Sequence, residues 1–186
     1  MTIRPRSTWA VALLALAAVA PARGDDIVNI AADYYGYQES PIIPNIGQAV
    51  TPLSTAPGGA FLQRTLTAGV YRITNAAGQL GALYDAFKFN QATTGENWTW
   101  NFLITNASAG DKAVLFGNGS GLAATEADAA ANAAGYVGYF ALTTNAVLNF
   151  MIRDAAVGDN TGGVSLQITQ IGSIGVTAVP EPAALA

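Results

Sequence analysis

The chain has 186 residues, with eight Lys and Arg, twelve Asp and Glu, and neither cysteine nor histidine. The lack of cysteine excludes disulfides, thiol nucleophiles and thiolate metal sites. The lack of histidine excludes the Ser-His-Asp triad and histidine-based zinc sites. Carboxylate chemistry remains open to an enzyme, but the acidic residues are scattered and form no recognisable catalytic pair.

Residues 1–24 have the three-part pattern of a cleaved secretory signal peptide. Arg4 and Arg6 give a positive start, and the uncharged apolar run WAVALLALAAVA is followed by small residues. Its twelve residues are fewer than the roughly 20 that a membrane-spanning helix needs. We therefore predict export with cleavage after Gly24, and cleavage after Ala22 is the alternative.

Cleavage would leave 162 residues, enough for one domain with a single core. It also removes three arginines, so five basic residues face twelve acidic ones and the formal charge becomes −7. No cluster of Lys or Arg remains, which argues against nucleic acid or an anionic membrane surface as the partner. An acidic surface instead suits solubility outside the cell and the binding of divalent cations.

Alternation of apolar and polar residues predicts a mostly β domain over residues 61–171. Trp98, Trp100, Phe102 and Ile104 alternate with polar residues, which places the aromatic side chains on one face of a strand. Exposed tryptophans would form a platform for sugar stacking, but this alternation favours packing in the core. The same pattern recurs at 148–152 and 164–168, and further strands are expected at 61–66, 70–75, 84–90, 113–117 and 138–143.

About eight short strands bounded by turn residues favour an all-β fold, an antiparallel two-sheet sandwich of jelly-roll kind. One short Ala-rich helix is predicted at 125–135, where Thr125 caps the start and Gly135 suits the end. Because its faces are almost all alanine, we expect it to cover an edge of the sandwich.

The segments on either side of residues 61–171 lack these patterns. Residues 25–60 contain several prolines and a Gly-Gly pair and are interpreted as an irregular N-terminal leader. We expect its tyrosines Tyr34, Tyr35 and Tyr37 either to pack over the sandwich or to line a binding edge. Residues 172–186 are rich in Gly, Ser, Ala and Pro and are predicted to form a flexible stalk.

The most chemically suggestive loop follows the expected strand at 148–152. It carries Asp154, Asp159 and Asn160 before a Gly-Gly turn into the last strand. Two carboxylates, an amide and nearby backbone carbonyls are the oxygen ligands that calcium prefers. Three interpretations stay open: a turn in which Asp and Asn bond their own backbone, calcium without a sugar, and calcium that bridges a glycan.

This loop resembles the end of the bacterial galactose-binding calcium lectins. In that family an aspartate and the run Gly-Asn-Asn-Ser-Gly-Ser lead into the final strand, and the calcium binds sugar hydroxyls directly. The likeness covers about 15 residues, and here Asp159 stands where the lectins have an amide. The loop after Asp154 is also shorter. The resemblance implies a calcium-dependent, carbohydrate-binding site on a galactose-binding-like sandwich.

The run Val179-Pro180-Glu181-Pro182 near the end of the chain resembles the PEP-CTERM sorting signal. That family belongs to Gram-negative bacteria that produce exopolysaccharide, and a membrane enzyme called an exosortase is thought to cut at this motif. In the family a hydrophobic stretch and a basic cluster follow, whereas this sequence stops at Ala186. It is therefore either truncated or has lost the sorting route.

Together these features predict an exported, non-catalytic protein of the cell surface or extracellular matrix. The PEP-CTERM resemblance implies an exosortase-like processing enzyme and extracellular polysaccharide as partners. We expect no membrane span in the mature chain as given. The alternative is an enzyme that acts on glycans with paired carboxylates.

Overall fold

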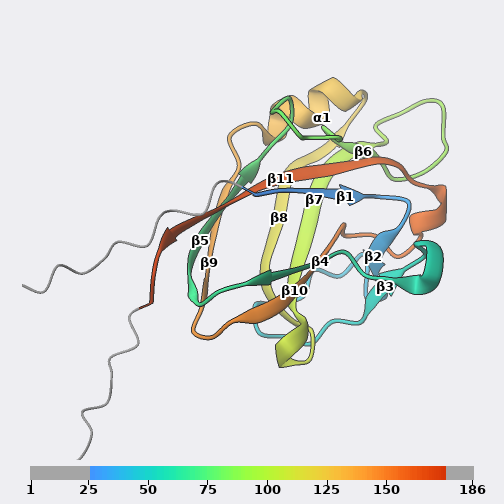
Figure 1. Ribbon diagram of the computed structural model, residues 1–186. Coiled ribbons are helices and arrows are strands. Elements are labelled where there is room, and N and C mark those ends of the chain that lie inside the picture. Colours follow the sequence, from blue (N-terminus) through green and yellow to red (C-terminus); the bar gives the residue numbers. More distant parts are fainter. Residues whose placement is uncertain (1–25, 175–186) are drawn as a thin grey trace, which may run out of the picture.

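The computed structural model describes residues 26–174, and strands make up most of its regular structure (Figure 1). The strands are β1 (Asp26–Ala31), β2 (Tyr35–Tyr37), β3 (Pro52–Ser54), β4 (Gln63–Leu66), β5 (Gly69–Asn75), β6 (Phe87–Lys88), β7 (Trp98–Asn106), β8 (Lys112–Ala123), β9 (Val137–Leu142), β10 (Ala146–Met151) and β11 (Thr161–Gly172). The α-helix is α1 (Glu126–Ala133), and the short 3-10 helices are η1 (Pro57–Gly59), η2 (Ala107–Ala109) and η3 (Val157–Asp159).

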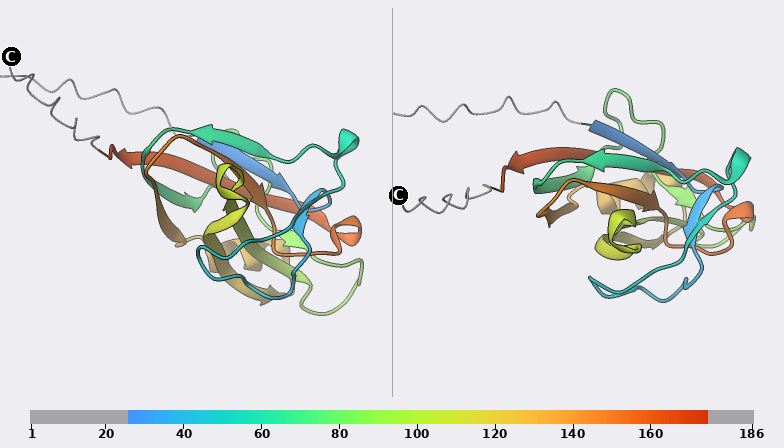
Figure 2. Two further views of the ribbon diagram at one scale, coloured as in Figure 1. Left: turned by 90° about the horizontal axis from the view of Figure 1, so that it is seen from below. Right: turned by 60° about the horizontal axis from the view of Figure 1, so that its bottom comes forward.

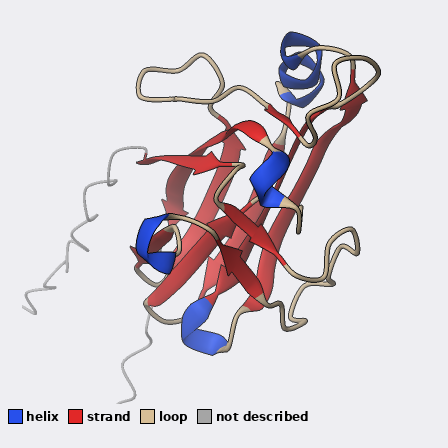
Figure 3. Ribbon diagram, turned by 90° about the vertical axis from the view of Figure 1, so that its right-hand side faces the viewer, coloured by secondary structure: helices blue, strands red, loops and turns tan. Residues whose placement is uncertain are grey.

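The strands form two facing antiparallel layers, which confirms the predicted all-β sandwich (Figures 1 and 3). One layer contains β1, β11, β5 and β9, and the other contains β4, β10, β7 and β8. The short strand β6 pairs with both β7 and the start of β11, so it joins the two layers. Strands β2 and β3 form a separate two-stranded sheet.

The core lies between the layers and contains the apolar residues that the alternation selected. Trp100, Phe102 and Ile104 of β7 are fully buried, as are Leu148 of β10 and Leu166 of β11. The rings of Trp100 and Phe102 meet edge to face with 5.3 Å between centroids. The expectation that the tryptophans belong to the core is thus confirmed for Trp100, and Trp98 is partly buried against the same cluster.

The first strand corrects the expectation of an irregular leader over residues 25–60. β1 pairs with β11 along its whole length, from Asp26 opposite Ile168 to Ala31 opposite Gly163. Val28 and Ile30 point into the core and are fully buried. The sandwich therefore begins at β1 and not at residue 61, because six residues with alternating buried apolar side chains suffice for a strand once β11 supplies the hydrogen-bonding partner.

Residues 33–56 cover the outer face of β7 and β10. Tyr37 and Val50 pack there against Leu103 of β7 and Met151 of β10 in a second apolar cluster. The backbone of this segment also bonds the sheet, where Ala113 N–H donates to the Gln48 carbonyl at 2.8 Å. In Figure 2 the part of this segment between β2 and β3, blue to cyan, runs as a long loop outside the sandwich. Packing of the leader over the sandwich, one of the two roles expected for its tyrosines, is thus confirmed for Tyr37.

Other boundaries differ modestly from the expected ones. The strand predicted at 84–90 is reduced to Phe87–Lys88, whereas the strand predicted at 113–117 extends over Lys112–Ala123. The helix forms where predicted, with the Thr125 hydroxyl accepting from Asp128 N–H at 3.1 Å. Its buried face is Ala129 and Ala133, and it packs on β7 and β8.

The predicted signal peptide at 1–24 and the sorting motif Pro180, Glu181 and Pro182 lie outside the described residues, as does most of the expected stalk at 172–186. β11 runs to Gly172, one residue past the expected end of the sandwich. Among residues 26–174, no helix has the length and apolar character needed to cross a bilayer.

Candidate functional site

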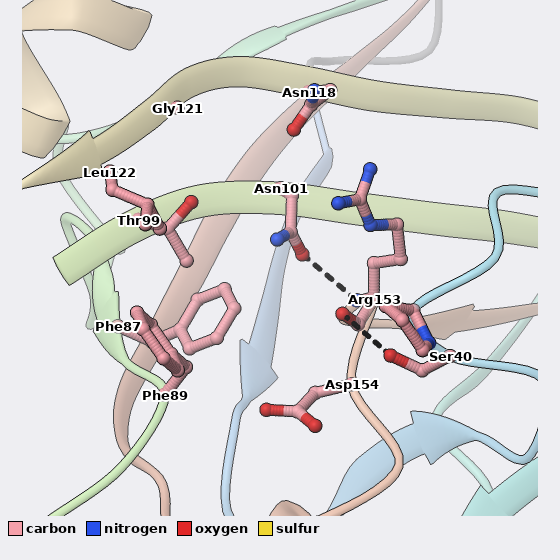
Figure 4. A pocket seen from close by; sticks show the side chains of 11 residues that line it. Ser40, Phe87, Phe89, Thr99, Asn101, Asn118, Gly121, Leu122, Arg153 and Asp154 are labelled. Atoms are coloured by element: carbon pink, nitrogen blue, oxygen red, sulfur yellow. Dashed lines mark hydrogen bonds between the residues drawn. The ribbon is translucent and has the colours of Figure 1, made fainter. Parts of the chain in front are cut away.

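A pocket of about 370 Å³ lies over the outer faces of β6, β7 and β8, next to the start of the β10–β11 loop (Figure 4). We call it the β6–β8 pocket. Its volume falls within the usual range for small-ligand sites, about 300–1,000 Å³. Ser40 and Pro41 of the β2–β3 segment and Arg153 and Asp154 of the β10–β11 loop close one side. Segments far apart in sequence therefore meet at this place.

The floor of the pocket combines aromatic and polar side chains. Phe87 and Phe89 lie together at one end, and Phe89 is half-buried beside the fully buried Phe87 (Figure 4). Thr99 and Asn101 follow on β7 at a spacing of two, so both face the same side. Asn101 sits opposite Asn118 of β8 in the strand register, which places two amides next to each other.

The Arg153 backbone is held by the residues around it. Its N–H donates to Oδ1 of Asn101 at 2.8 Å, and its carbonyl accepts from the Ser40 hydroxyl at 3.3 Å. Figure 4 shows the guanidinium directed toward Asn101 and Asn118. Its Nε and Nη1 are buried and have no hydrogen-bond partner among the described residues. The pocket is thus lined by a cation whose backbone is fixed and whose Nε and Nη1 donors are unused.

Asp154 lines the same pocket but points away from the guanidinium (Figure 4). Its Oδ1 accepts from Ala156 N–H at 2.9 Å, the bond of an Asx turn. Its carbonyl accepts from Tyr37 N–H at 3.1 Å, which ties the loop to β2. Gly36 is required for this approach, because a Cβ there would overlap the Asp154 carbonyl and lie 2.6 Å from Val157 Cγ1.

The electrostatics of the rim reflect burial and local hydrogen bonds. Burial raises the pKa of Tyr37 to about 12, against the opposing effect of the nearby Arg153 charge. The Tyr37 hydroxyl stays protonated and donates to the Ile42 carbonyl at 2.8 Å. Partial burial would raise the pKa of Glu39, but hydrogen bonds from the hydroxyl and N–H of Thr51 outweigh it and lower that pKa. Both interactions hold the segment that carries Ser40.

The other two predicted calcium ligands do not line the β6–β8 pocket. Asn160 is buried and its Nδ2 donates to the Ala32 carbonyl at 3.2 Å, while its N–H donates to the Val157 carbonyl. Oδ1 of Asp159 and Oδ1 of Asn160 are buried without a hydrogen-bond partner in the described part of the chain. These two oxygens suit a hard cation. No group of three or more acidic side chains within residues 26–174 is arranged to hold a metal.

Sequence reasoning found Asp154 but missed most of the pocket. It did not single out Arg153, Asn101, Asn118 or Phe89, because these residues come from four separate segments. A partial signal was present in the polar residues Asn97, Thr99 and Asn101, which alternate with the core residues of β7. This pattern marks one strand face as polar but says nothing of what lies over it.

Comparison of the chain with protein-family models, with curated proteins and with solved structures finds no match. The functional assignment therefore rests on the residues of this chain and on their geometry.

Proposed function

We propose that this chain is an exported, non-catalytic cell-surface or matrix protein that binds extracellular polysaccharide through the β6–β8 pocket. The observation that carries this proposal is the composition of the pocket: aromatic rings at one end and amide, carboxylate and guanidinium groups at the other. The export pattern of residues 1–24 and the motif at Pro180, Glu181 and Pro182 support a surface location reached through an exosortase-like enzyme in a Gram-negative bacterium.

Carbohydrate matches this composition in its chemistry. One face of a pyranose ring presents C–H groups that pack well on an aromatic ring such as that of Phe89. Its hydroxyls both donate and accept hydrogen bonds, and the amides of Asn101 and Asn118 offer both functions. Asp154 adds a carboxylate that can accept from two hydroxyls. Because Phe87 and the Arg153 backbone are fixed by packing and hydrogen bonds, the site needs little reordering to bind.

The carboxylates near the pocket favour binding over catalysis. Among the described residues that line it, Asp154 alone carries a carboxylate. Glycoside hydrolysis ordinarily uses two, one on each side of the scissile bond. The alternative, a carboxylate-based enzyme that acts on glycans, would have to draw a second acid from elsewhere.

Calcium remains part of the proposal as a structural ion of the β10–β11 loop. The unpartnered oxygens of Asp159 and Asn160 support it, and Asp154 at the start of the loop would complete the predicted ligand set. Asp154 already caps its own turn, so the ion would have to share that carboxylate or leave it to the turn. Bound here, calcium would stiffen the loop that presents Arg153 and Asp154 to the pocket.

The proposal is tested by binding of the purified protein to a panel of bacterial polysaccharides and oligosaccharides, with and without chelator. We expect binding to be lost or strongly weakened by Phe89→Ala. Phe61→Ala is the matched control, because Phe61 is 42% exposed and does not line the pocket. A hydrolysis assay on the same glycans distinguishes the enzyme alternative. Equal binding by both variants would rule out the pocket as the binding site.

A further inference from the structure

The unpaired guanidinium of Arg153 is the feature of the β6–β8 pocket that neutral sugar does not explain. No carboxylate among residues 26–174 lies within 4.0 Å of it; the ion pair at that distance is Arg64 with Asp26, at 3.4 Å. Its Nε and Nη1 lack hydrogen-bond partners although they are buried. Buried N–H donors that lack an acceptor are costly, more so when they belong to a charged group. An anion in the pocket would remove that cost.

The shape of the guanidinium selects among anions. Its planar fork of N–H donors matches the two oxygens of a carboxylate. Beside it, Oδ1 of Asn101 already accepts from the Arg153 N–H, so Nδ2 is the atom of this amide that can donate to a ligand. Phe89 lies at the other end of the pocket, where a ring face can pack. We propose that the pocket binds a uronic acid residue of the polysaccharide, with its carboxylate on Arg153 and its hydroxyls on Asn101, Asn118 and Asp154; this inference rests on the proposed function.

General electrostatic attraction cannot be the source of such binding. The chain beyond residue 24 has a formal charge of −7, so a polyanion is repelled at long range. At physiological ionic strength this repulsion is screened beyond about 8 Å, and the local field of Arg153 dominates inside the pocket. The Asp154 side chain points away from the guanidinium (Figure 4), so its repulsion of an anion is weakest next to Arg153.

The test compares two ligands of equal length by isothermal titration calorimetry: tetragalacturonic acid and its carboxyl-reduced, neutral counterpart. Wild-type protein should bind the acid about ten- to a hundredfold more tightly, the range expected for a hydrogen-bonded ion pair. Arg153→Gln should abolish that preference, and Arg153→Lys should retain part of it, because lysine keeps the charge but not the fork. Acetate at the same carboxylate concentration should not displace the tetramer.

The matched control is Arg72→Gln. Arg72 on β5 also has an unpartnered Nε, but it does not line the pocket. Folding of each variant is checked by its melting temperature, and Arg153→Gln should melt no lower than wild type because it removes an unpaired charge.

Each result separates this inference from the proposed function. Equal affinity for the acid and the neutral tetramer, with Arg153→Gln binding like wild type, would overturn the uronate assignment and leave the polysaccharide pocket standing. Displacement by acetate would equally overturn it. Absence of binding to either tetramer and to every glycan of the panel would overturn both. Arg72→Gln should leave the preference for the acid intact. If it removes that preference as fully as Arg153→Gln does, the preference does not depend on the pocket and the assignment is refuted.

Discussion

Replacing Asp111 tests whether the polar groups on the outer face of the sandwich depend on one carboxylate. Oδ1 of Asp111 accepts from Nδ2 of Asn149 at 2.6 Å and from Oγ1 of Thr105 at 3.0 Å. Both donors are buried, with exposed fractions of 2% and 0%. Asn149 in turn accepts from Nε2 of Gln63 at 2.9 Å. The carboxylate thus anchors a network that spans β4, β10 and β7.

The cost of Asp111→Ala follows from these contacts. Each buried donor that loses its acceptor costs about 1–3 kcal/mol. The backbone at Asp111 is left-handed, with φ 53°, and alanine tolerates that conformation about 1 kcal/mol less well than aspartate. We therefore expect the free energy of unfolding to fall by about 3–7 kcal/mol. Asp111→Asn keeps an acceptor and the left-handed preference, so its loss should be about 1–2 kcal/mol.

Equilibrium urea denaturation, followed by the fluorescence of the buried Trp100, measures these changes. With a slope of about 2–3 kcal/mol per molar urea, Asp111→Ala should lower the midpoint by about 1–3.5 M. Asp111→Gly relieves the backbone strain but still leaves the buried donors unsatisfied, so its midpoint should lie between those of Asp111→Asn and Asp111→Ala. Equal losses for Asp111→Asn and Asp111→Ala would show that the acceptor role is not what stabilises this region.

Three further predictions follow from the packing, the tyrosines and the acidic loop. Gly117→Ala should destabilise the protein by about 1–3 kcal/mol in calorimetry, because the added Cβ would overlap the Phe102 ring. Gly135→Ala should not destabilise it, because a Cβ there meets no atom within 4 Å. Equal effects of the two substitutions would contradict this account of the packing. Burial raises the pKa values of Tyr37 and Tyr136 to about 12. Their contribution to the free energy of unfolding is therefore complete below pH 10 and should fall between pH 10 and 12, by about 1.4 kcal/mol per pH unit for each tyrosine. A urea midpoint unchanged between pH 9 and 11 would refute this. Calcium at 100 times its dissociation constant should stabilise the protein by about 2.7 kcal/mol. This stabilisation should appear as a higher melting temperature, and Asp159→Ala should abolish the increase. Identical melting of the wild type in calcium and in chelator would refute the calcium site and support the interpretation of the loop as a turn.

The sequence alone predicted the features that depend on neighbouring residues. Period-two alternation identified the core face of β7, β10 and β11, because successive side chains of any strand point to opposite faces. Thr125 marked the start of α1 because an N-cap satisfies a backbone N–H only three residues away. Turn residues between these segments indicated antiparallel pairing and so the sandwich class.

Only the tertiary structure decided what covers the polar faces of these strands. Thr99, Asn101, Thr105 and Asn149 belong to the polar face of the same alternation, yet all are buried. Residues 33–56 and the loops at the pocket cover them. Asp111 accepts from Thr105 and Asn149, and Oδ1 of Asn101 accepts from the Arg153 N–H. No local pattern encodes this, because the covering segment lies tens of residues away along the chain. The β6–β8 pocket arises in the same way, from Phe89, Asn101, Asn118 and Arg153, which only the folded sandwich brings together.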